Sequence, residues 1–252
     1  MQRYFYANNL VDNKLELPKD IYKHAITVMR MRVGDKFEVV TPDEKVQVME
    51  LTNVSKNEAE AIVVEQFEHH TKLPVETTIV CGLSKGDKAE FIVQKGTELG
   101  ADHFIFFKGD FSIAKWDDKK QAKKLARLEK IALAAAEQSH RTTIPTVSYL
   151  SSLSQLTLAQ GEVGVVAYEE AAKKGEKANL VKVLEKLAKK DAPRLTAVFG
   201  PEGGISTKEI ELLEEKGFVT AGLGPRIMRA ETAPLYLLAT LSYAFELMDT
   251  DF

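Results

Sequence analysis

The sequence predicts an α/β protein in which a domain with a mostly parallel sheet follows a small β-rich unit. Three observations support this prediction. From Val75 onward, short apolar runs alternate with amphipathic helical segments, which is typical of a parallel sheet covered on both faces. Residues 1–70 instead contain short runs rich in β-branched and aromatic residues, divided by turns. Two Gly/Pro loops directly follow two of the later apolar runs.

Composition limits the possible classes of protein. With 252 residues, 44% of them hydrophobic, the chain is long enough for two domains. A net charge of −3 argues against indiscriminate nucleic-acid binding. No apolar run approaches the roughly 20 residues that cross a membrane, and the N-terminus lacks the features of a signal peptide, so we expect a cytoplasmic protein. The single cysteine, Cys81, lies in an apolar run, which predicts a buried thiol and excludes a disulfide framework or a cysteine-rich zinc site.

Residues 1–72 are assigned to the first domain. Its predicted strands are Gln2–Tyr6, Lys36–Val40, Val46–Leu51 and Ala59–Phe67, with one helix from Asp20 to Arg30. Arg30 and Arg32 lie at the corner after this helix, and we expect them near Arg3 of the first strand. Three guanidinium groups would suit phosphate, because each can donate two parallel hydrogen bonds. The alternative is that they serve solubility and favourable charge at a helix C-terminus.

Residues 73–252 are assigned to the second domain. Its predicted strands are Val75–Leu83, His103–Lys108, Pro145–Tyr149, Val163–Tyr168, Leu195–Phe199 and Phe218–Ala221. Helices are expected from Asp87 to Gly100, Asp118 to Ser139, Leu153 to Ala159, Leu180 to Lys189, Ser206 to Lys216 and Thr232 to Met248. Asp87 with Glu90, and Ser206 with Glu209, have the spacing of a capping box. Residues 108–130 carry eight Lys or Arg against four Asp or Glu, which fits either a solvated helix face or a patch that binds phosphates.

The two loops, Gly200–Gly204 and Gly222–Pro225, follow successive predicted strands, so they are expected at one edge of the sheet, where ligands bind in open α/β folds. Neither loop has the dinucleotide or the P-loop fingerprint. Glu202 suits a ligand with positive charge or ribose hydroxyls, and glycines allow the backbone to approach an adenine edge. S-adenosylmethionine has all of these groups, so the pattern favours it as the cofactor.

At this point the sequence resembles a known family. G-P-E-G-G followed by L-G-P-R-I-M-R-A-E-T-A is similar to the C-terminal half of the SPOUT, or trefoil-knotted, methyltransferases. The resemblance is strongest to the RsmE family, which methylates N3 of a uridine in small-subunit ribosomal RNA. M-Q-R-Y-F, M-R-M-R-V-G-D, Lys95–Gly100 and Ala136–Ser139 also resemble that family, so the likeness covers nearly the whole chain. After Ser139 the family often has glycine and then arginine, whereas this chain has His140 and then Arg141.

The resemblance implies a knot in which the second loop tucks under the first, and a PUA-like β-barrel at the N-terminus that binds RNA. It also implies 16S ribosomal RNA of the small subunit as the partner, and a homodimer with the active site at the subunit interface. The apolar C-terminal helix independently favours a homodimer. No metal is expected.

The expected site has three groups of residues. The cofactor contacts are Tyr168, Gly200, Pro201, Glu202, Gly203, Leu223, Gly224, Ile227, Met228 and Arg229. The RNA contacts are Arg3, Arg30, Arg32 and Arg141. Arg229 is the first catalytic candidate, because a guanidinium can stabilise charge that develops on a uracil oxygen. Glu231, the second, either accepts the N3 proton or orients Arg229 by an ion pair, and we favour the ion pair.

Two other functions remain open from the sequence. One is methylation of a ribose 2′-hydroxyl in RNA on the same fold. The other is RNA binding through the β-rich domain without catalysis, although such a module would not need two glycine loops at adjacent strand ends.

Overall fold

The computed structural model describes residues 1–168 and 179–248, which form two compact units. One unit comprises Met1–Thr71 together with Glu137–Thr143, and the other comprises the described parts of Lys72–Ala136 and Ile144–Phe252. The segment Glu137–Thr143, which begins at the end of the helix Asp118–Gln138, groups with the first unit and not with the residues on either side of it. No helix among the described residues is both long and apolar enough to cross a membrane.

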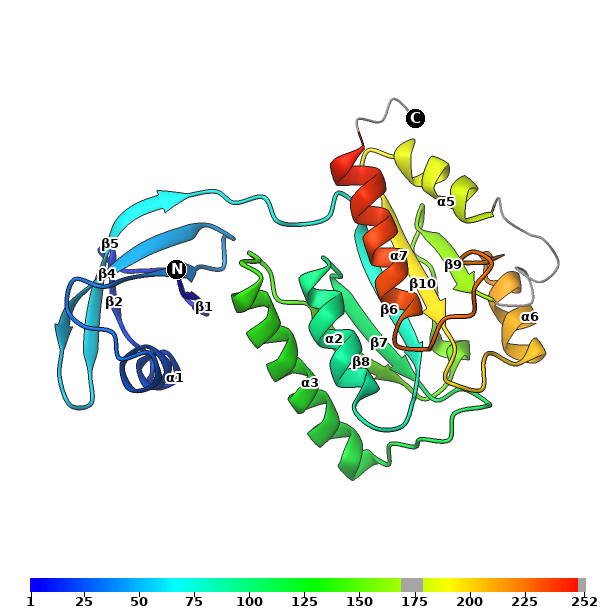
Figure 1. Cartoon of the computed structure of the whole chain (residues 1–252), viewed down its shortest axis with the longest axis horizontal. Coiled ribbons are helices and arrows are strands. Elements are labelled where there is room, and N and C mark those ends of the chain that lie inside the picture. The colour runs from blue at the N-terminus through cyan, green and yellow to red at the C-terminus, as the bar shows by residue number, and fades with distance from the viewer. Residues whose placement is uncertain (169–178, 249–252) are drawn as a thin grey trace. The chain divides into compact units, whose positions relative to one another are not determined.

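The first unit is built on a five-stranded sheet with the order β1-β3-β4-β5-β2 (Figure 1). The first two strands of this order, β1 and β3, are parallel, and the other neighbours are antiparallel. The strands are β1 (Arg3–Phe5), β2 (Lys14–Glu16), β3 (Lys36–Val40), β4 (Val46–Val54) and β5 (Ala59–Phe67). The sequence does not predict β2, because three residues are too short for a pattern to indicate a strand.

One helical segment packs on this sheet. It begins as α1 (Lys19–Tyr22) and continues as a π-helical turn, η1 (Lys23–Val28). Ile21 and Ala25 are buried and join the core formed by the sheet. The predicted end at Arg30 is two residues late, since Arg30 already has a φ of 57°, outside the helical region.

Arg3 is part of the interior of the first unit. Its side chain is 1% exposed, and its Nε lies 2.8 Å from Oε2 of Glu38. The guanidinium also donates to the backbone carbonyls of His140 and Arg141. A buried charge requires such partners, because desolvation without them is very costly. Arg3 therefore ties β1 and β3 to Glu137–Thr143, and its burial removes the reason for expecting it to contact a phosphate.

The structure explains the unusual residue at position 140. His140 has a φ of 57°, in the left-handed region that glycine enters without the steric cost of a Cβ atom. Its Nδ1 lies 3.1 Å from the same Glu38 oxygen that pairs with Arg3. A glycine would adopt this backbone more easily, but it would lose the contact with Glu38. The turn is therefore retained with histidine, and its partly exposed side chain contacts the buried Arg3–Glu38 ion pair.

The second unit is an α/β domain with an all-parallel sheet in the order β11-β9-β10-β6-β7-β8, which confirms the predicted fold class. Its strands are β6 (Glu76–Gly82), β7 (His103–Phe107), β8 (Thr146–Leu150), β9 (Val163–Ala167), β10 (Arg194–Phe199) and β11 (Phe218–Ala221). These bounds lie within two residues of the predicted ones.

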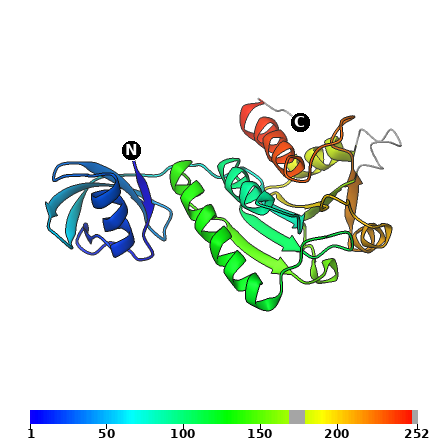
Figure 2. The ribbon, with the colours of Figure 1, turned by 60° about the horizontal axis from the view of Figure 1, so that its bottom comes forward.

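Helices cover both faces of this sheet, as the sequence predicted. The described helices are α2 (Lys88–Glu98), α3 (Asp118–Gln138), η2 (Leu153–Gln155), α5 (Asn179–Ala188), α6 (Thr207–Glu215) and α7 (Ala233–Ser242), which continues as η3 (Tyr243–Leu247). Residues of α2, α3, α5 and α7 share one core with alternate strand residues such as Ile79, Cys81 and Phe199. Residues of α6 and η2 form a second core with Val80 and Val198. Figures 1 and 2 show α2 and α7 side by side on the first of these faces.

The two predicted capping boxes have different outcomes. Ser206 and Glu209 cap α6 as predicted, with both side-chain-to-backbone hydrogen bonds present. At α2 the prediction is wrong, because Asp87 makes no capping hydrogen bond with its side chain. Glu90 pairs instead with Arg127 of α3 at 2.7 Å. The tertiary ion pair takes the carboxylate that the local motif would need.

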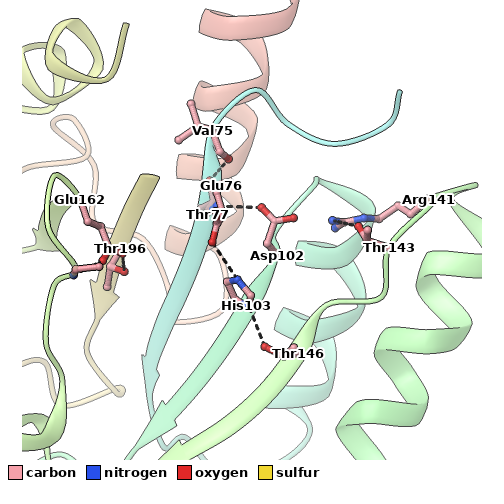
Figure 3. A network of polar contacts seen from close by, with 11 residues as sticks. Val75, Glu76, Thr77, Asp102, His103, Arg141, Thr143, Thr146, Glu162 and Thr196 are labelled. Carbon is pink, nitrogen blue, oxygen red and sulfur yellow. Dashed lines mark hydrogen bonds and ion pairs between the residues drawn. The ribbon is translucent and has the colours of Figure 1, made fainter. Parts of the chain in front are cut away.

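Polar contacts bind the strands together at their amino ends, away from the edge where the glycine loops lie (Figure 3). The backbone N–H of Thr77 at the start of β6 donates to Asp102, just before β7, at 3.0 Å. His103 of β7 lies 2.8 Å from the hydroxyl of Thr146 in β8, between Nδ1 and Oγ1. These contacts fix the register of neighbouring strands, and with it the position of their carboxyl ends.

Glu137 should make stability pH-dependent. Burial, with a smaller effect from Asp20, raises its pKa to about 7, although a hydrogen bond from the Phe5 backbone opposes this. The folded state therefore binds more protons than the unfolded state between the ordinary value of 4.5 and about 7, and stability falls as pH rises through this range. We expect Glu137→Gln to raise the thermal midpoint relative to the native protein at pH 8, but little at pH 5. Glu129→Gln, an exposed change on the same helix, is the control. An equal effect of Glu137→Gln at both pH values would contradict the assignment.

Candidate functional site

The arrangement of three strands creates the site. In the sheet, β9 lies between β10 and β11, and all three are parallel. The loops after β10 and β11 therefore start on either side of Tyr168, the residue that follows β9. The backbone N–H of Tyr168 donates to the carbonyl of Ala221, the last residue of β11, at 3.0 Å. The two loops thus meet at the carboxyl edge of the sheet, as the sequence analysis expected.

A pocket of about 480 Å³ lies between the first loop and residues 227–233, which follow the second loop. The residues that line it are Lys88, Ala167, Tyr168, Phe199, Gly200, Pro201, Glu202, Gly203, Gly204, Ile205, Ile227, Met228, Arg229, Ala230 and Ala233. Eight of the ten residues predicted to contact a cofactor are among them. Leu223 and Gly224 are not: Leu223 packs against the main core, and Gly224 is exposed with a φ of 101°.

The first loop is packed closely on its neighbours, and two glycines permit this. A Cβ atom at Gly200 would lie 2.8 Å from the backbone carbon of Gly204, closer than side chains normally approach. A Cβ atom at Gly203 would lie 2.8 Å from Cβ of Phe111. Glycine is therefore required at these positions by space, which holds the loop in one shape around the pocket.

The capping box of α6 also anchors this loop to the segment after β7. Ser206 Oγ accepts from the Glu209 N–H at 3.2 Å and donates to Asp110 Oδ2 at 2.6 Å. Glu209 in turn accepts from the backbone N–H groups of Ser206 and Asp110, at 2.9 and 3.0 Å. Glu209 is only 8% exposed, so these bonds are shielded from water. The helix start is thus a rigid base for the glycine loop.

An ion-pair cluster lies on one side of the pocket. The ammonium nitrogen of Lys88, the first residue of α2, lies 3.0 Å from Oε1 of Glu202 in the first loop. The same nitrogen lies 3.2 Å from Oε2 of Glu231, in the segment between β11 and α7. Glu202 also accepts from the backbone N–H of Lys85 at 3.2 Å. One cation therefore contacts both segments that form the pocket.

The pKa values within this cluster agree with its geometry. Hydrogen bonding to Glu202, reinforced by Glu231, raises the pKa of Lys88 above its ordinary value, so its ammonium is fully charged at neutral pH. Burial acts to raise the pKa of Glu202, but backbone hydrogen bonds and Lys88 outweigh it and hold that pKa below the ordinary value. Both groups are therefore charged whenever the protein is near neutral pH.

Arg229 differs from the other charged residues of the pocket. Its side chain is exposed at the rim, and within the described residues its guanidinium makes no ion pair or side-chain hydrogen bond. Its backbone carbonyl accepts from the N–H groups of Thr232 and Ala233, which fixes the residue at the start of α7. The expected ion pair between Arg229 and Glu231 does not form in the described part of the chain, since the Glu231 carboxylate contacts Lys88 instead.

Comparison with known proteins agrees with this geometry. Residues 71–242 match the family model described as an RNA methyltransferase domain, and residues 17–64 match the RNA methyltransferase PUA domain. Over its whole length the chain is 43% identical to the ribosomal RNA small subunit methyltransferase E of Bacillus subtilis, which it covers completely. The chain belongs to the ribosomal RNA small subunit methyltransferase E family.

Solved structures of related proteins have the same fold. The ribosomal RNA small subunit methyltransferase E of Neisseria gonorrhoeae, bound to S-adenosylmethionine, superposes with a TM-score of 0.82 at 27% identity, over 97% of this chain and 98% of that one. A putative methyltransferase of Legionella pneumophila with S-adenosylmethionine also gives a TM-score of 0.82, at 26% identity, over 96% and 97% of the two chains.

The four arginines of this chain that were expected to contact RNA lie in different environments. Arg30 and Arg32 are exposed at the turn after η1, and the Arg32 backbone N–H is held by Asp35 at 2.7 Å. Arg3 and Arg141 are buried, at 1% and 3% exposed. A phosphate can reach the first pair only, so Arg3 and Arg141 belong to the interior of the first unit.

Sequence reasoning about this family member missed Lys88. Its partners lie more than a hundred residues further along the chain, so no local spacing links them. The one available signal was its position, because a cation at the first residue of a helix is unfavourable to the helix dipole and therefore needs an explanation.

The α6 cap provides a test of how the pocket is supported. We expect Ser206→Ala to lower the free energy of unfolding by about 1–2 kcal/mol, because it removes the cap and leaves the Glu209 backbone N–H and the Asp110 carboxylate without the hydroxyl that each contacts. Ser152→Ala, which removes an exposed cap from the short helix η2, is the matched control and should cost less. Chemical denaturation of both variants measures the difference. Equal losses would show that the buried network adds nothing.

Proposed function

We propose that this protein transfers the methyl group of S-adenosylmethionine to N3 of a uridine in 16S ribosomal RNA of the small ribosomal subunit, in the cytoplasm. Membership of the ribosomal RNA small subunit methyltransferase E family supports the reaction class. The observation that carries the proposal is the position of Arg229, an exposed guanidinium without an acidic partner among the described residues, at the rim of the pocket. The trefoil knot that the resemblance implies remains part of the proposal.

The residues of the pocket fit S-adenosylmethionine. A volume of about 480 Å³ is in the usual range for a small-molecule site. The glycine loop leaves backbone groups accessible, and Phe199, Ile205 and Met228 provide apolar walls for an adenine ring. When bound, S-adenosylmethionine supplies an electrophilic methyl group on a sulfonium. Glu202 was expected to contact this ligand, but its carboxylate already contacts Lys88, so we assign ligand recognition mainly to the loop backbone.

Arg229 provides the chemistry that a uracil needs. The N3–H of uracil is a weak acid, and its loss places negative charge on O2 and O4. A guanidinium that donates to one of these oxygens stabilises the anion and makes loss of the proton easier. Arg229 is free to do this because Glu231 does not hold it. Its exposure also allows the N3 proton to pass to water, so the proposal requires no buried base.

The first unit provides a surface for RNA in this proposal. Arg30 and Arg32 lie on an exposed turn with Val28, Met29 and Val33, three exposed apolar residues. Exposed guanidiniums bind phosphates, and apolar side chains can contact unstacked bases.

A homodimer is also proposed. It is supported by the apolar side chains exposed along α7 and η3, which are Tyr236, Tyr243 and Leu247 at 39%, 58% and 73% exposed.

Arg229→Ala should abolish methyl transfer while leaving cofactor affinity within about threefold of the native value, because the loop backbone binds the cofactor and Arg229 stabilises the reacting base. Transfer to 30S subunits is measured with labelled S-adenosylmethionine, and affinity by calorimetry. Arg226→Ala is the matched control, since Arg226 is exposed nearby but does not line the pocket. Transfer by Arg229→Ala within severalfold of the native rate would refute the assignment, and a methyl group found on ribose would refute the N3 product.

Reversing the charges of Arg30 and Arg32 to glutamate should weaken RNA binding and lower the steepness of its salt dependence. Loss of two phosphate contacts to single-stranded RNA reduces the slope of log K against log salt by about 1.4. The same double reversal at Lys186 and Lys189 of the second unit changes the net charge equally and serves as the control. An unchanged slope for the Arg30 and Arg32 variant would assign those residues to solubility alone.

A further inference from the structure

The position of Lys88 conflicts with local helix electrostatics. Lys88 is the first residue of α2, where the unpaired N–H groups favour a negative charge and disfavour a cation. Asp87, the residue before it, makes no side-chain hydrogen bond to the helix start. A lysine here is therefore unfavourable for the helix itself, and the reason for it must lie in its tertiary contacts.

Those contacts join three separate segments of the chain. The ammonium nitrogen lies 3.0 Å from Glu202 and 3.2 Å from Glu231, so α2, the loop after β10 and the segment before α7 meet at one cation. The side chains of Lys88, Glu202 and Glu231 are 23%, 33% and 20% exposed. Oε2 of Glu231 is buried and makes no hydrogen bond within the described residues, so this carboxylate depends on Lys88.

We propose that Lys88 is a positioning residue. Its ammonium compensates two carboxylates that would otherwise repel each other, and so holds the loop after β10 and the segment before α7 together at the pocket. This inference rests on the proposed function, because it concerns the site where S-adenosylmethionine is expected to bind. Lys88 acts through Glu202 and Glu231, which belong to the two segments that shape the pocket.

Charge, rather than packing, explains why the residue must be cationic. Both carboxylates lie within contact distance of one nitrogen, so a neutral side chain of equal size would leave two negative charges close together in a partly buried place. Like charges at such a site disfavour the arrangement unless one carboxylate takes up a proton. Without that proton, repulsion between the two carboxylates would separate the two segments, and the pocket would open.

Among residues 1–168 and 179–248, few other charged groups are near enough to change this balance. Lys85 contributes its backbone N–H to Glu202, and Asp87 adds a further negative charge beside Lys88. Tyr168 and Arg229 line the pocket, but neither forms an ion pair with the two glutamates within the described residues. Lys88 is thus the cation that compensates both carboxylates there.

This role predicts a distinctive pH dependence for a variant without the lysine. In Lys88→Met, closing the pocket brings the two carboxylates together and raises the pKa of one of them, so closure takes up a proton. Cofactor affinity relative to the native protein should therefore improve as pH falls from 8 toward 5.5. In the native protein the ammonium makes this proton unnecessary. At each pH, the ratio of the Lys88→Met affinity to the native affinity is independent of the titration of the ligand itself.

The experiment is calorimetry of S-adenosylmethionine and of S-adenosylhomocysteine with the full-length protein, at pH 8 and pH 5.5. The variants are Lys88→Met, Lys88→Arg and the double variant Lys88→Met/Glu231→Gln. Lys95→Met is the matched control. Lys95 lies on the same helix and does not line the pocket, and its ammonium nitrogen lies 2.8 Å from Oε1 of Glu98. The demethylated ligand lacks the sulfonium charge, so it separates effects on the loops from effects on ligand charge.

At pH 8 we expect Lys88→Met to weaken both ligands about tenfold, the equivalent of one pKa unit, and to recover about twofold of that loss at pH 5.5. Lys88→Arg should retain affinity within about threefold at both pH values, since the charge remains. The double variant should recover at pH 8, because only one carboxylate charge is left. Lys95→Met should match the native protein.

Several results would overturn the proposal. Unchanged affinity in Lys88→Met would show that the lysine does not position the loops. A loss that neither low pH nor Glu231→Gln relieves would assign Lys88 to packing alone. A loss confined to S-adenosylmethionine would show that Lys88 acts on the charge of the ligand.

A measurement without ligand keeps this inference separate from the proposed function. Carboxyl resonances of Glu202 and Glu231 can be titrated by carbon NMR in the cofactor-free protein. In Lys88→Met, one of the two carboxyls should titrate about one pH unit higher than in the native protein. If the native protein binds neither ligand, the proposed cofactor is wrong, whereas this titration still decides whether Lys88 separates the two carboxylates.

Discussion

The parallel pairing of β9 between β10 and β11 is the constraint on which the site depends. Because the three strands run the same way, the segments that follow them leave from one edge of the sheet. Two of those segments are rich in glycine and proline, and residues from both line the pocket beside Tyr168, the residue after β9. Polar contacts at the opposite ends of β6, β7 and β8 fix the register that this geometry needs (Figure 3). The pocket is thus a consequence of sheet order and loop composition together.

Close packing of the loops also determines which interactions can hold them. The first loop is fixed by the close approach of its glycines to neighbouring atoms and by the cap at Ser206. A hydrophobic side chain at either glycine would displace the loop. In the second segment, Glu231 contacts the ammonium of Lys88, which compensates its charge within the described residues. The two sides of the pocket are therefore held by different physical means. One side is held by close packing and the cap, and the other is held by charge.

The sequence predicted the features that depend on neighbouring residues alone, namely one helix cap and the strand bounds. The cap formed by Ser206 and Glu209 lies within one helical turn, so its spacing is sufficient, and strand bounds follow from short apolar runs. The same spacing failed at Asp87, because Arg127 of a different helix takes Glu90. Arg3 and Arg30 look alike in the sequence, yet one is buried in an ion pair and the other is exposed. Burial and long-range pairing are properties of the fold, and a single sequence contains no direct signal for them.

Charge balance around the pocket determines which cation is left to attract an anionic partner. Lys88 engages both nearby carboxylates, which leaves Arg229 as an uncompensated cation at the rim within the described residues. An uncompensated guanidinium on an exposed rim attracts an anionic partner, whereas the same group paired with Glu231 would not. A nucleic acid carries its charge on the backbone, and a deprotonated uracil carries it on the base, so in the proposed function one arginine serves both approach and reaction. The lysine that holds the loops also keeps that arginine available.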